Sequence, residues 1–159
     1  MLKVRAEDLP AQVEKILVED KSMKKQLDEI QALRGKAEAN ELLMAAKKIG
    51  AINFISGIVK AKDMDELREV ADFLIDKIET GVLILAAVDG QKVHLVAKAD
   101  KKAVALGIHS GKITKEIAQI IGGGGGGRPD MAQAGGKIPE ALPKMFEIAE
   151  EIVRKSVKA

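Results

Sequence analysis

The sequence has no cysteine, no tryptophan and no tyrosine, and only three of its 159 residues are phenylalanine. Without cysteine the chain can form no disulfide, no thiolate metal site and no cysteine nucleophile, which fits a reducing compartment. With so few aromatic rings, the core has to be built from aliphatic side chains. Proteins that bind single-stranded nucleic acid usually stack bases on such rings, so an RNA partner would be read through its backbone and folded shape.

Long apolar runs are also missing. No stretch reaches the roughly 18 residues that a membrane span needs, and the first eight residues lack the apolar run of a signal peptide. We therefore expect a cytoplasmic protein without a membrane partner. Hydrophobic residues make up 47% of the chain and charged residues 31%, a balance typical of globular proteins. The length allows one core domain and an appended element.

The formal net charge of +2 hides an uneven distribution. Residues 63–79 hold seven acidic and two basic residues, whereas residues 91–137 hold eight basic and three acidic residues. The second region could attract a polyanion such as RNA, and the first would repel it.

Residues 10–49 have the apolar spacing of a long helix. Read as heptads, the helix has an imperfect seam, because Asp20 and Arg34 fall at a positions. The helix could pack on a partner helix or on a second copy of the chain, or it could be a solvated connecting arm. Its apolar stripe consists of Val13, Ile16, Leu17, Met23, Leu27, Ile30 and Leu33.

The rest of the chain changes its period several times, which indicates a mixed unit of helices and strands. Asp63, with Glu66 three residues later, predicts a capped helix, and Asp89-Gly90 predicts a tight hairpin. We expect an α/β fold of the α+β type: a helical arm over residues 1–50, and a small mixed-sheet domain flanked by helices over residues 51–159. The predicted strands cover residues 52–61, 82–88, 91–98 and 131–137, and the predicted helices cover 63–79, 112–121 and 139–155.

Six consecutive glycines, Gly122, Gly123, Gly124, Gly125, Gly126 and Gly127, are the most unusual feature of the chain. We predict a loop here. It follows a helix rather than a strand and is followed by Arg128-Pro129, so it fits neither a dinucleotide fingerprint nor a phosphate-binding loop. Successive glycine N–H groups could still face one anion beside the Arg128 guanidinium. A flexible linker is the alternative, although Pro129, Asp130 and Gly135-Gly136 are typical of an ordered segment.

No complete active site is visible in the sequence. It has no Ser-His-Asp set, no H-E-x-x-H pair and no zinc-ligand spacing, and we interpret His94 and His109 as structural or surface residues. We therefore expect no catalysis by this chain alone. The basic residues around the glycines could form a phosphate-facing surface, although solvated lysines are the simpler interpretation: Lys98, Lys101, Lys102, Lys112, Lys115, Arg128 and Lys137.

Three segments resemble the alanyl-tRNA synthetase family. Residues 123–136, Gly-Gly-Gly-Gly-Gly-Arg-Pro-Asp-Met-Ala-Gln-Ala-Gly-Gly, are similar to the glycine-rich signature of the DHH-associated domain that closes those enzymes. Residues 107–118 resemble the segment just upstream of that signature, and residues 2–17 resemble the entry into the family's helical arm. The resemblance covers nearly the whole chain and implies a carboxy-terminal fragment, so we expect Met1 to be an added residue.

The resemblance also implies a function and partners. In the family this region holds the outer corner, or elbow, of the tRNA for alanine and couples aminoacylation with editing. The fragment would need no cofactor, since the ATP, Mg and zinc sites of the parent enzyme lie in its upstream catalytic and editing domains. The glycine run with Arg128 and Lys137 is the first candidate RNA contact, followed by Lys101, Lys102 and Lys112.

Two alternatives are kept. The fragment could chiefly oligomerise the synthetase through its first helix, or it could be the substrate-binding lobe of a DHH-type phosphoesterase.

Overall fold

The computed structural model describes residues 9–158, which form two compact units. The first unit ends at Arg34 and the second begins at Gly35, earlier than the predicted boundary after residue 50. Helix α1 (Leu9–Met44) contributes to both units. No helix within the described residues is long and apolar enough to cross a membrane.

The predicted helix 10–49 is too long at its C-terminal end, because residues 47–49 form a short strand. Gly50 has a φ of +62° and allows a tight turn after this strand. The turn buries Ile49 and its cross-strand partner Ile52. The free energy gained by this burial exceeds that of adding another turn to the helix.

The second unit contains one mixed sheet, as predicted. The sheet has six strands, two more than the four predicted from the sequence. Its strand order is β1-β2-β3-β4-β6-β5. Strands β2 and β3 are parallel and are joined through helix α2 (Met64–Ile75), while all other neighbouring strands are antiparallel. The strands are β1 (Lys47–Ile49), β2 (Ile52–Ile58), β3 (Gly81–Asp89), β4 (Lys92–Ala99), β5 (Gly124–Gly127) and β6 (Met131–Gly136).

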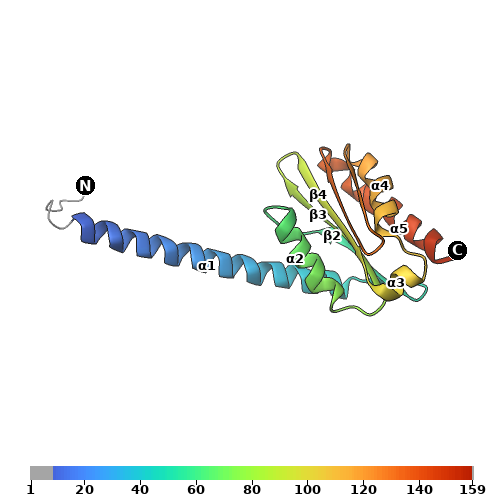
Figure 1. Cartoon of the computed structure of the whole chain (residues 1–159), viewed down its shortest axis with the longest axis horizontal. Coiled ribbons are helices and arrows are strands. Elements are labelled where there is room, and N and C mark those ends of the chain that lie inside the picture. The colour runs from blue at the N-terminus through green and yellow to red at the C-terminus, as the bar shows by residue number, and fades with distance from the viewer. Residues whose placement is uncertain (1–8, 159) are drawn as a thin grey trace. The chain divides into compact units, whose positions relative to one another are not determined.

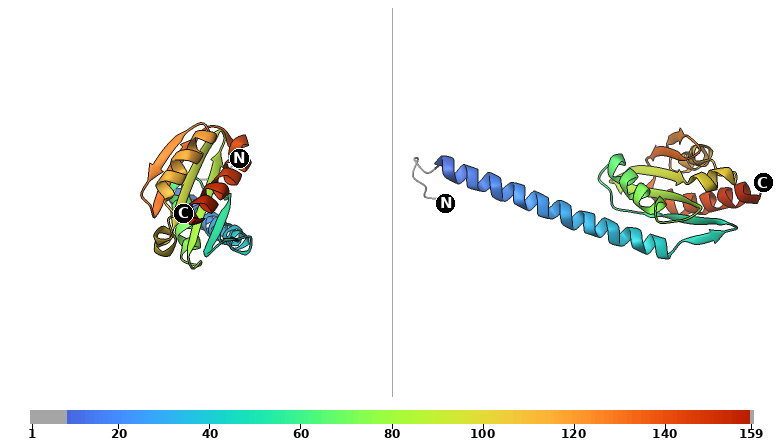
Figure 2. Two further views of the ribbon diagram at one scale, coloured as in Figure 1. Left: turned by 90° about the vertical axis from the view of Figure 1, so that its right-hand side faces the viewer. Right: turned by 60° about the horizontal axis from the view of Figure 1, so that its bottom comes forward.

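Both faces of the sheet are covered by helices. Helix α2 and the last turns of α1 pack on one face, and α4 (Ser110–Ile120) and α5 (Leu142–Lys158) pack on the other (Figure 1). Figure 2 shows α4 and α5 side by side over the sheet. Strand β3 alternates between the two cores, with Ile84 in one and Leu85 in the other. Two short helices, α3 (Lys101–Ala105) and the 3-10 helix η1 (Pro139–Ala141), complete the unit.

Local signals in the sequence predicted several of these elements. The Asp63 carboxylate accepts from the Glu66 N–H at 2.9 Å, and the Glu66 carboxylate accepts from the Lys62 N–H at 2.6 Å, so the predicted cap of α2 is confirmed. The hairpin between β3 and β4 is confirmed too. Its loop is shifted by one residue, because Asp89 pairs with Lys92 and leaves Gly90-Gln91 as the two loop residues.

Asp100 ties the start of β3 to the start of α3. Its carboxylate accepts from the N–H groups of Ala103 at 2.7 Å, Thr80 at 3.1 Å and Gly81 at 3.2 Å. Thr80 has a φ of +52°, the only positive φ of a non-glycine residue in the described chain. The hydrogen bond from Thr80 therefore helps to hold a backbone conformation that a β-branched residue rarely adopts.

Replacement of Asp100 with alanine should destabilise the chain by about 1–3 kcal/mol, because a helix cap and two further backbone partners are lost together. Urea unfolding measures this change. The matched substitution Asp89→Ala, at an exposed hairpin position, should shift the free energy of unfolding by less than about 0.5 kcal/mol. Equal effects of the two substitutions would contradict the role given to Asp100.

Glu150 links α5 to the edge strand β1. Its carboxylate accepts from Lys47 Nζ at 2.8 Å and from Arg154 Nη2 at 2.7 Å. The hydrogen bonds from Lys47 and then from Arg154 hold the pKa of Glu150 below its ordinary value of 4.5, against a smaller opposing effect of burial. The ionised form is therefore favoured in the folded state.

A lowered folded-state pKa gives stability that is present above the ordinary pKa and lost as pH falls through the folded value. Wild type should therefore lose more stability than Glu150→Gln between about pH 5 and pH 3, by less than about 1 kcal/mol because Lys47 and Arg154 are exposed. Chemical unfolding of both proteins at several pH values tests this. Parallel stability curves would show that Glu150 contributes nothing to the pH dependence.

Candidate nucleic-acid interface

The glycine run forms an edge strand rather than the predicted loop. Gly122 ends α4 with a φ of +70°, and its N–H bonds the carbonyl of Gln119 at 3.2 Å. Gly124–Gly127 then form β5, whose one partner strand among residues 9–158 is β6. Because successive N–H groups of an extended strand point to opposite sides, the run does not gather them around one anion.

Packing explains part of the glycine run. A Cβ on Gly123, Gly125 or Gly127 would clash with backbone atoms of the neighbouring strand β6 or of the residues that flank it. A Cβ on Gly111, in the first turn of α4, would clash with the Gly127 carbonyl. Glycine at position 111 therefore allows α4 to lie directly on the edge of the sheet, while the glycines of β5 allow its close pairing with β6.

The N-terminus of α4 has its donors occupied by the protein itself. The N–H of Ser110 bonds the Pro129 carbonyl at 2.9 Å, and the N–H of Gly111 bonds the Arg128 carbonyl at 3.1 Å. His109 caps the helix by accepting the Lys112 N–H at Nδ1, at 3.3 Å. His109 thus has a structural position, and this helix end is filled by the β5–β6 turn rather than open to an anion.

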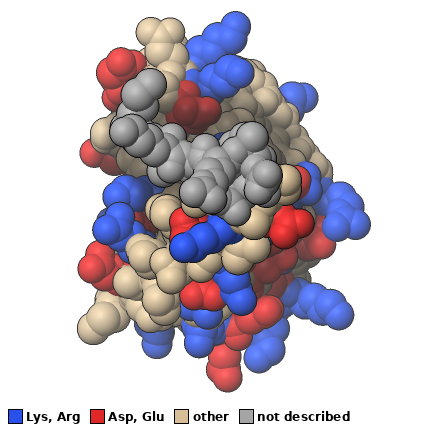
Figure 3. Space-filling view, turned by 90° about the vertical axis from the view of Figure 1, so that its left-hand side faces the viewer, with Lys and Arg blue, Asp and Glu red and all other residues tan. Residues whose placement is uncertain are grey.

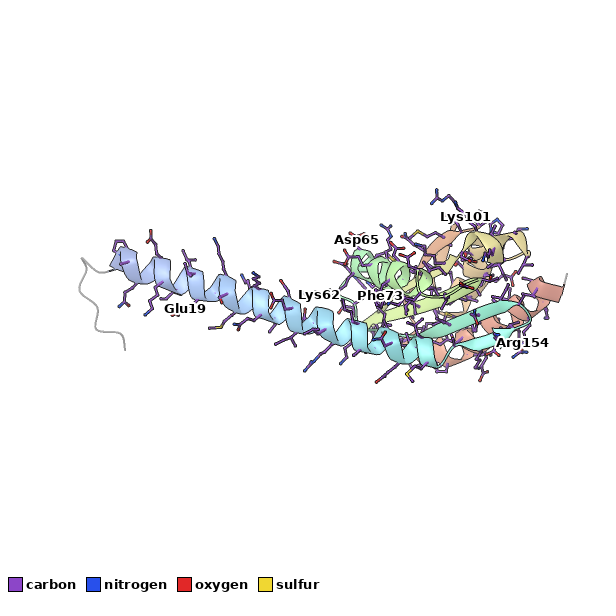
Figure 4. All side chains as sticks on the ribbon, turned by 90° about the horizontal axis from the view of Figure 1, so that it is seen from below. Glu19, Lys62, Asp65, Phe73, Lys101 and Arg154 are labelled. Carbon is purple, nitrogen blue, oxygen red and sulfur yellow. The ribbon has the colours of Figure 1, made fainter. Side chains whose placement is uncertain are left out.

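Four of the predicted basic residues come from segments that meet at the β5–β6 turn, and we call them the tip surface: Lys101, Lys102, Lys112 and Arg128. The hydrogen bonds just described place Lys112 beside this turn. The Ala99 N–H bonds the Asp130 carbonyl at 2.9 Å, which places the start of α3 beside it as well. All four side chains belong to exposed residues, and Lys101 projects outward from α3 in Figure 4.

Lys137 does not belong to this group. It follows β6 at the opposite end from the turn, where its N–H bonds the carbonyl of Ile121 at 2.8 Å. It lies six residue steps of extended chain from Met131, which corresponds to about 20 Å. Lys98 is also set apart, because it forms an ion pair with Asp72 of α2. Lys115 lies nearly one turn further along α4 and is exposed.

The cations of the tip surface are available for a partner. Lys101, Lys102 and Lys112 form no ion pair within residues 9–158. Arg128 lies 3.4 Å from Asp130, Nε to Oδ1, and its side chain is 76% exposed. Such an exposed pair is worth about 0–1 kcal/mol, so a phosphate can replace it.

In Figure 3, which views the molecule from the left-hand side of Figure 1, basic and acidic side chains are interspersed. The face visible there carries no broad field of one sign.

Two residues beside the glycine strand were not among the predicted contact residues. Gln133 pairs with Gly126 across the β5–β6 ribbon, and Arg68 of α2 donates to the Gln133 side chain at 2.8 Å. Pairing the glycine run with residues 131–136 as a hairpin could have identified Gln133. Nothing in the sequence indicates the contact from Arg68, which depends on how α2 packs. The described residues contain no group of three or more potential ligands that could hold a metal ion.

Known proteins share this fold and sequence. The DHHA1 domain model matches residues 51–155. The alanine–tRNA ligase of Oceanobacillus iheyensis is 40% identical over 157 residues, which are 99% of this chain and 18% of that protein. The Bacillus subtilis ligase is 38% identical over 96% of this chain and 17% of its own length. The chain thus spans less than a fifth of these curated relatives.

A solved structure adds to this agreement. The C-Ala domain from Aquifex aeolicus alanyl-tRNA synthetase is 28% identical, with a TM-score of 0.64, and the match covers 69% of this chain and 97% of that domain. The resemblance that we identified from the glycine signature is confirmed. The chain belongs to the DHHA1 domain family and is similar over almost its whole length to a segment of alanine–tRNA ligases.

Proposed function

We propose that this chain is the tRNA-binding module of an alanyl-tRNA synthetase, which holds the elbow of the tRNA for alanine and couples aminoacylation with editing. The observation that carries the proposal is the tip surface, on a chain that is similar to alanine–tRNA ligases over 99% of its length. The module works in the cytoplasm beside the catalytic and editing domains of the same enzyme. ATP, Mg and zinc act in those domains, and the chain itself takes no cofactor.

The chemistry of the tip surface suits an RNA backbone. Arg128 offers a planar guanidinium that can bond a phosphate through two N–H groups, and Lys101, Lys102 and Lys112 add point charges around it. The four basic residues of the tip surface come from three different segments of the chain, so they can contact the same RNA together only when the domain is folded. The scarcity of aromatic side chains favours a folded RNA over a splayed single strand.

A second function, self-association, is favoured by the first unit. Val13, Ile16, Leu17, Met23, Leu27 and Ile30 of α1 are all half exposed or more. An apolar stripe of this length is typical of a helix that packs on another helix. Asp20 interrupts the stripe, and its carboxylate pairs with Lys24 at 3.2 Å. We propose that two copies of the synthetase associate through this stripe.

Replacement of Arg128 with alanine should weaken binding of folded tRNA for alanine by about 1–3 kcal/mol, because a charge-assisted phosphate contact is lost. Lys112→Ala should weaken binding less and flatten the salt dependence by about one phosphate contact. Titrations of folded tRNA and of an unfolded RNA of equal length, across a salt series, measure both effects.

Lys144→Ala is the control for that series, because Lys144 is exposed on α5, away from the β5–β6 turn. It should leave the affinity unchanged. Equal binding of folded and unfolded RNA, or unchanged affinity of Arg128→Ala, would exclude the tip surface as the site of tRNA recognition.

Replacement of Leu27 and Ile30 together with lysine should turn an oligomer into a monomer in sedimentation experiments, because two charges would be buried in the helix seam. Glu29→Lys introduces the same side chain on the other side of the helix and should leave the oligomer intact. A wild-type chain that sediments as a monomer would rule out self-association of the isolated chain.

A further inference from the structure

The β5–β6 ribbon has one face that α4 does not cover. The register places Gly124 opposite Gly135 and Gly126 opposite Gln133, and directly opposed residues share a face. Ala134 lies on the other face, in the core with α4. We call the face that carries Gly124, Gly126, Gln133 and Gly135 the open face.

Gln133 is the polar side chain at the centre of the open face, and its orientation is fixed. Arg68 Nη2 donates to Gln133 Oε1 at 2.8 Å. A guanidinium can only donate, so the amide oxygen must face Arg68 and the two amide N–H groups must face away from it. The amide therefore presents donors that can bond an acceptor above the ribbon.

Arg68 holds this amide although its own hydrogen bonding is incomplete. Its Nη1 bonds Asp65 Oδ1 at 3.1 Å, while its Nε is buried and has no partner. A buried donor without a partner costs folding free energy and calls for an explanation. Orientation of Gln133 for a ligand supplies one.

The glycines of the open face allow a ligand to come close. An added Cβ would meet nothing within 4 Å at Gly124 or Gly126, and only an ordinary contact at 3.7 Å at Gly135. None of the three has a positive φ. The fold thus accepts side chains at positions where the sequence has none, which is expected where a backbone approaches a ligand.

Helix α2 is acidic overall, so the attraction of the open face for an anionic backbone comes from Arg128 and from the pairing of two acidic side chains of α2 with basic partners. Asp65 and Asp72, two acidic residues of α2 beside this face, are paired with Arg68 and Lys98. Arg128 directly follows β5 on the same alternation as Gly124 and Gly126, and it is exposed. Arg128, the exposed cation at the end of the ribbon, and the Gln133 amide therefore lie along the same face of the ribbon.

We infer that Gln133, oriented by Arg68, donates hydrogen bonds to the ribose-phosphate backbone of the RNA, which lies on the open face of the β5–β6 ribbon and continues to Arg128. This inference rests on the proposed tRNA-binding function. Gln133 is a contact residue in this arrangement, and Arg68 is a positioning residue.

The first test is Gln133→Glu, titrated with folded tRNA for alanine. Glutamate keeps the oxygen that Arg68 bonds, and it replaces the amide donors with a negative charge. The affinity should fall at least about tenfold, while the thermal unfolding temperature stays near that of wild type. Gln119→Glu is the matched control, because Gln119 is exposed on α4, which covers the opposite face. Its affinity should stay within about twofold.

A steric variant keeps the inference testable if Gln133→Glu fails to fold. Gly126→Val adds a strand-favouring side chain at a position with open space around the Cβ. It should fold at least as stably as wild type and lose at least about tenfold in affinity, because the RNA can no longer approach the ribbon.

A double-mutant cycle tests the role of Arg68. Arg68→Met should weaken binding in the wild-type background and have little further effect in Gln133→Leu, whereas a purely structural or long-range charge effect would be the same in both. Unchanged affinity of both Gln133→Glu and Gly126→Val, with wild type still binding tRNA, would overturn the inference and leave the tip surface intact. A wild-type chain that binds no tRNA would overturn the proposed function and this inference with it.

Discussion

The close approach of α4 to the edge strand β5 is the contact on which the functional end of the domain depends. The backbones of Gly111 in α4 and Gly127 in β5 are in contact. A Cβ at position 111 would lie only 2.2 Å from the Gly127 carbonyl oxygen, so no larger residue fits there. With α4 in this position, its first two N–H groups reach the carbonyls of Pro129 and Arg128. The turn that carries Arg128 is therefore fixed to the helix that carries Lys112, and the position of one basic residue determines that of the other.

The sequence predicted elements well where the signal was local. The cap at Asp63, the helical spacing of residues 63–79 and the turn residues after β3 all identify structure over a few neighbouring positions, and the structure contains α2 and the β3–β4 hairpin. It predicted poorly where the stabilising contacts are distant. Glycine has low strand propensity, and Gly124–Gly127 form a strand through backbone contacts with distant residues. Their local sequence therefore does not predict the strand.

The short elements show the same limit. Strand β1 exists because Ile49 is buried against β2, although its residues continue a helical pattern. Helix α3 has five residues, too few for a periodic signal, and it depends on the Asp100 carboxylate. For the candidate site, closeness to the glycine run in the sequence predicted closeness in space where the chain turns back, as for Arg128 and Lys112. It did not predict closeness in space where an extended strand carries the chain away from the turn, as for Lys137.

The order of the strands has a consequence for how the domain assembles. Strands β3 and β4 are joined by a two-residue loop, so their pairing closes early and at little entropic cost. The pairing of β4 with β6 must instead enclose residues 100–130, and β5 adds almost no side-chain burial of its own. We expect the β5–β6 ribbon to join the sheet last and to open first in native-state fluctuations. A ligand bound across this ribbon would then act as a clamp on the least protected edge of the domain and slow the exchange of its amide hydrogens.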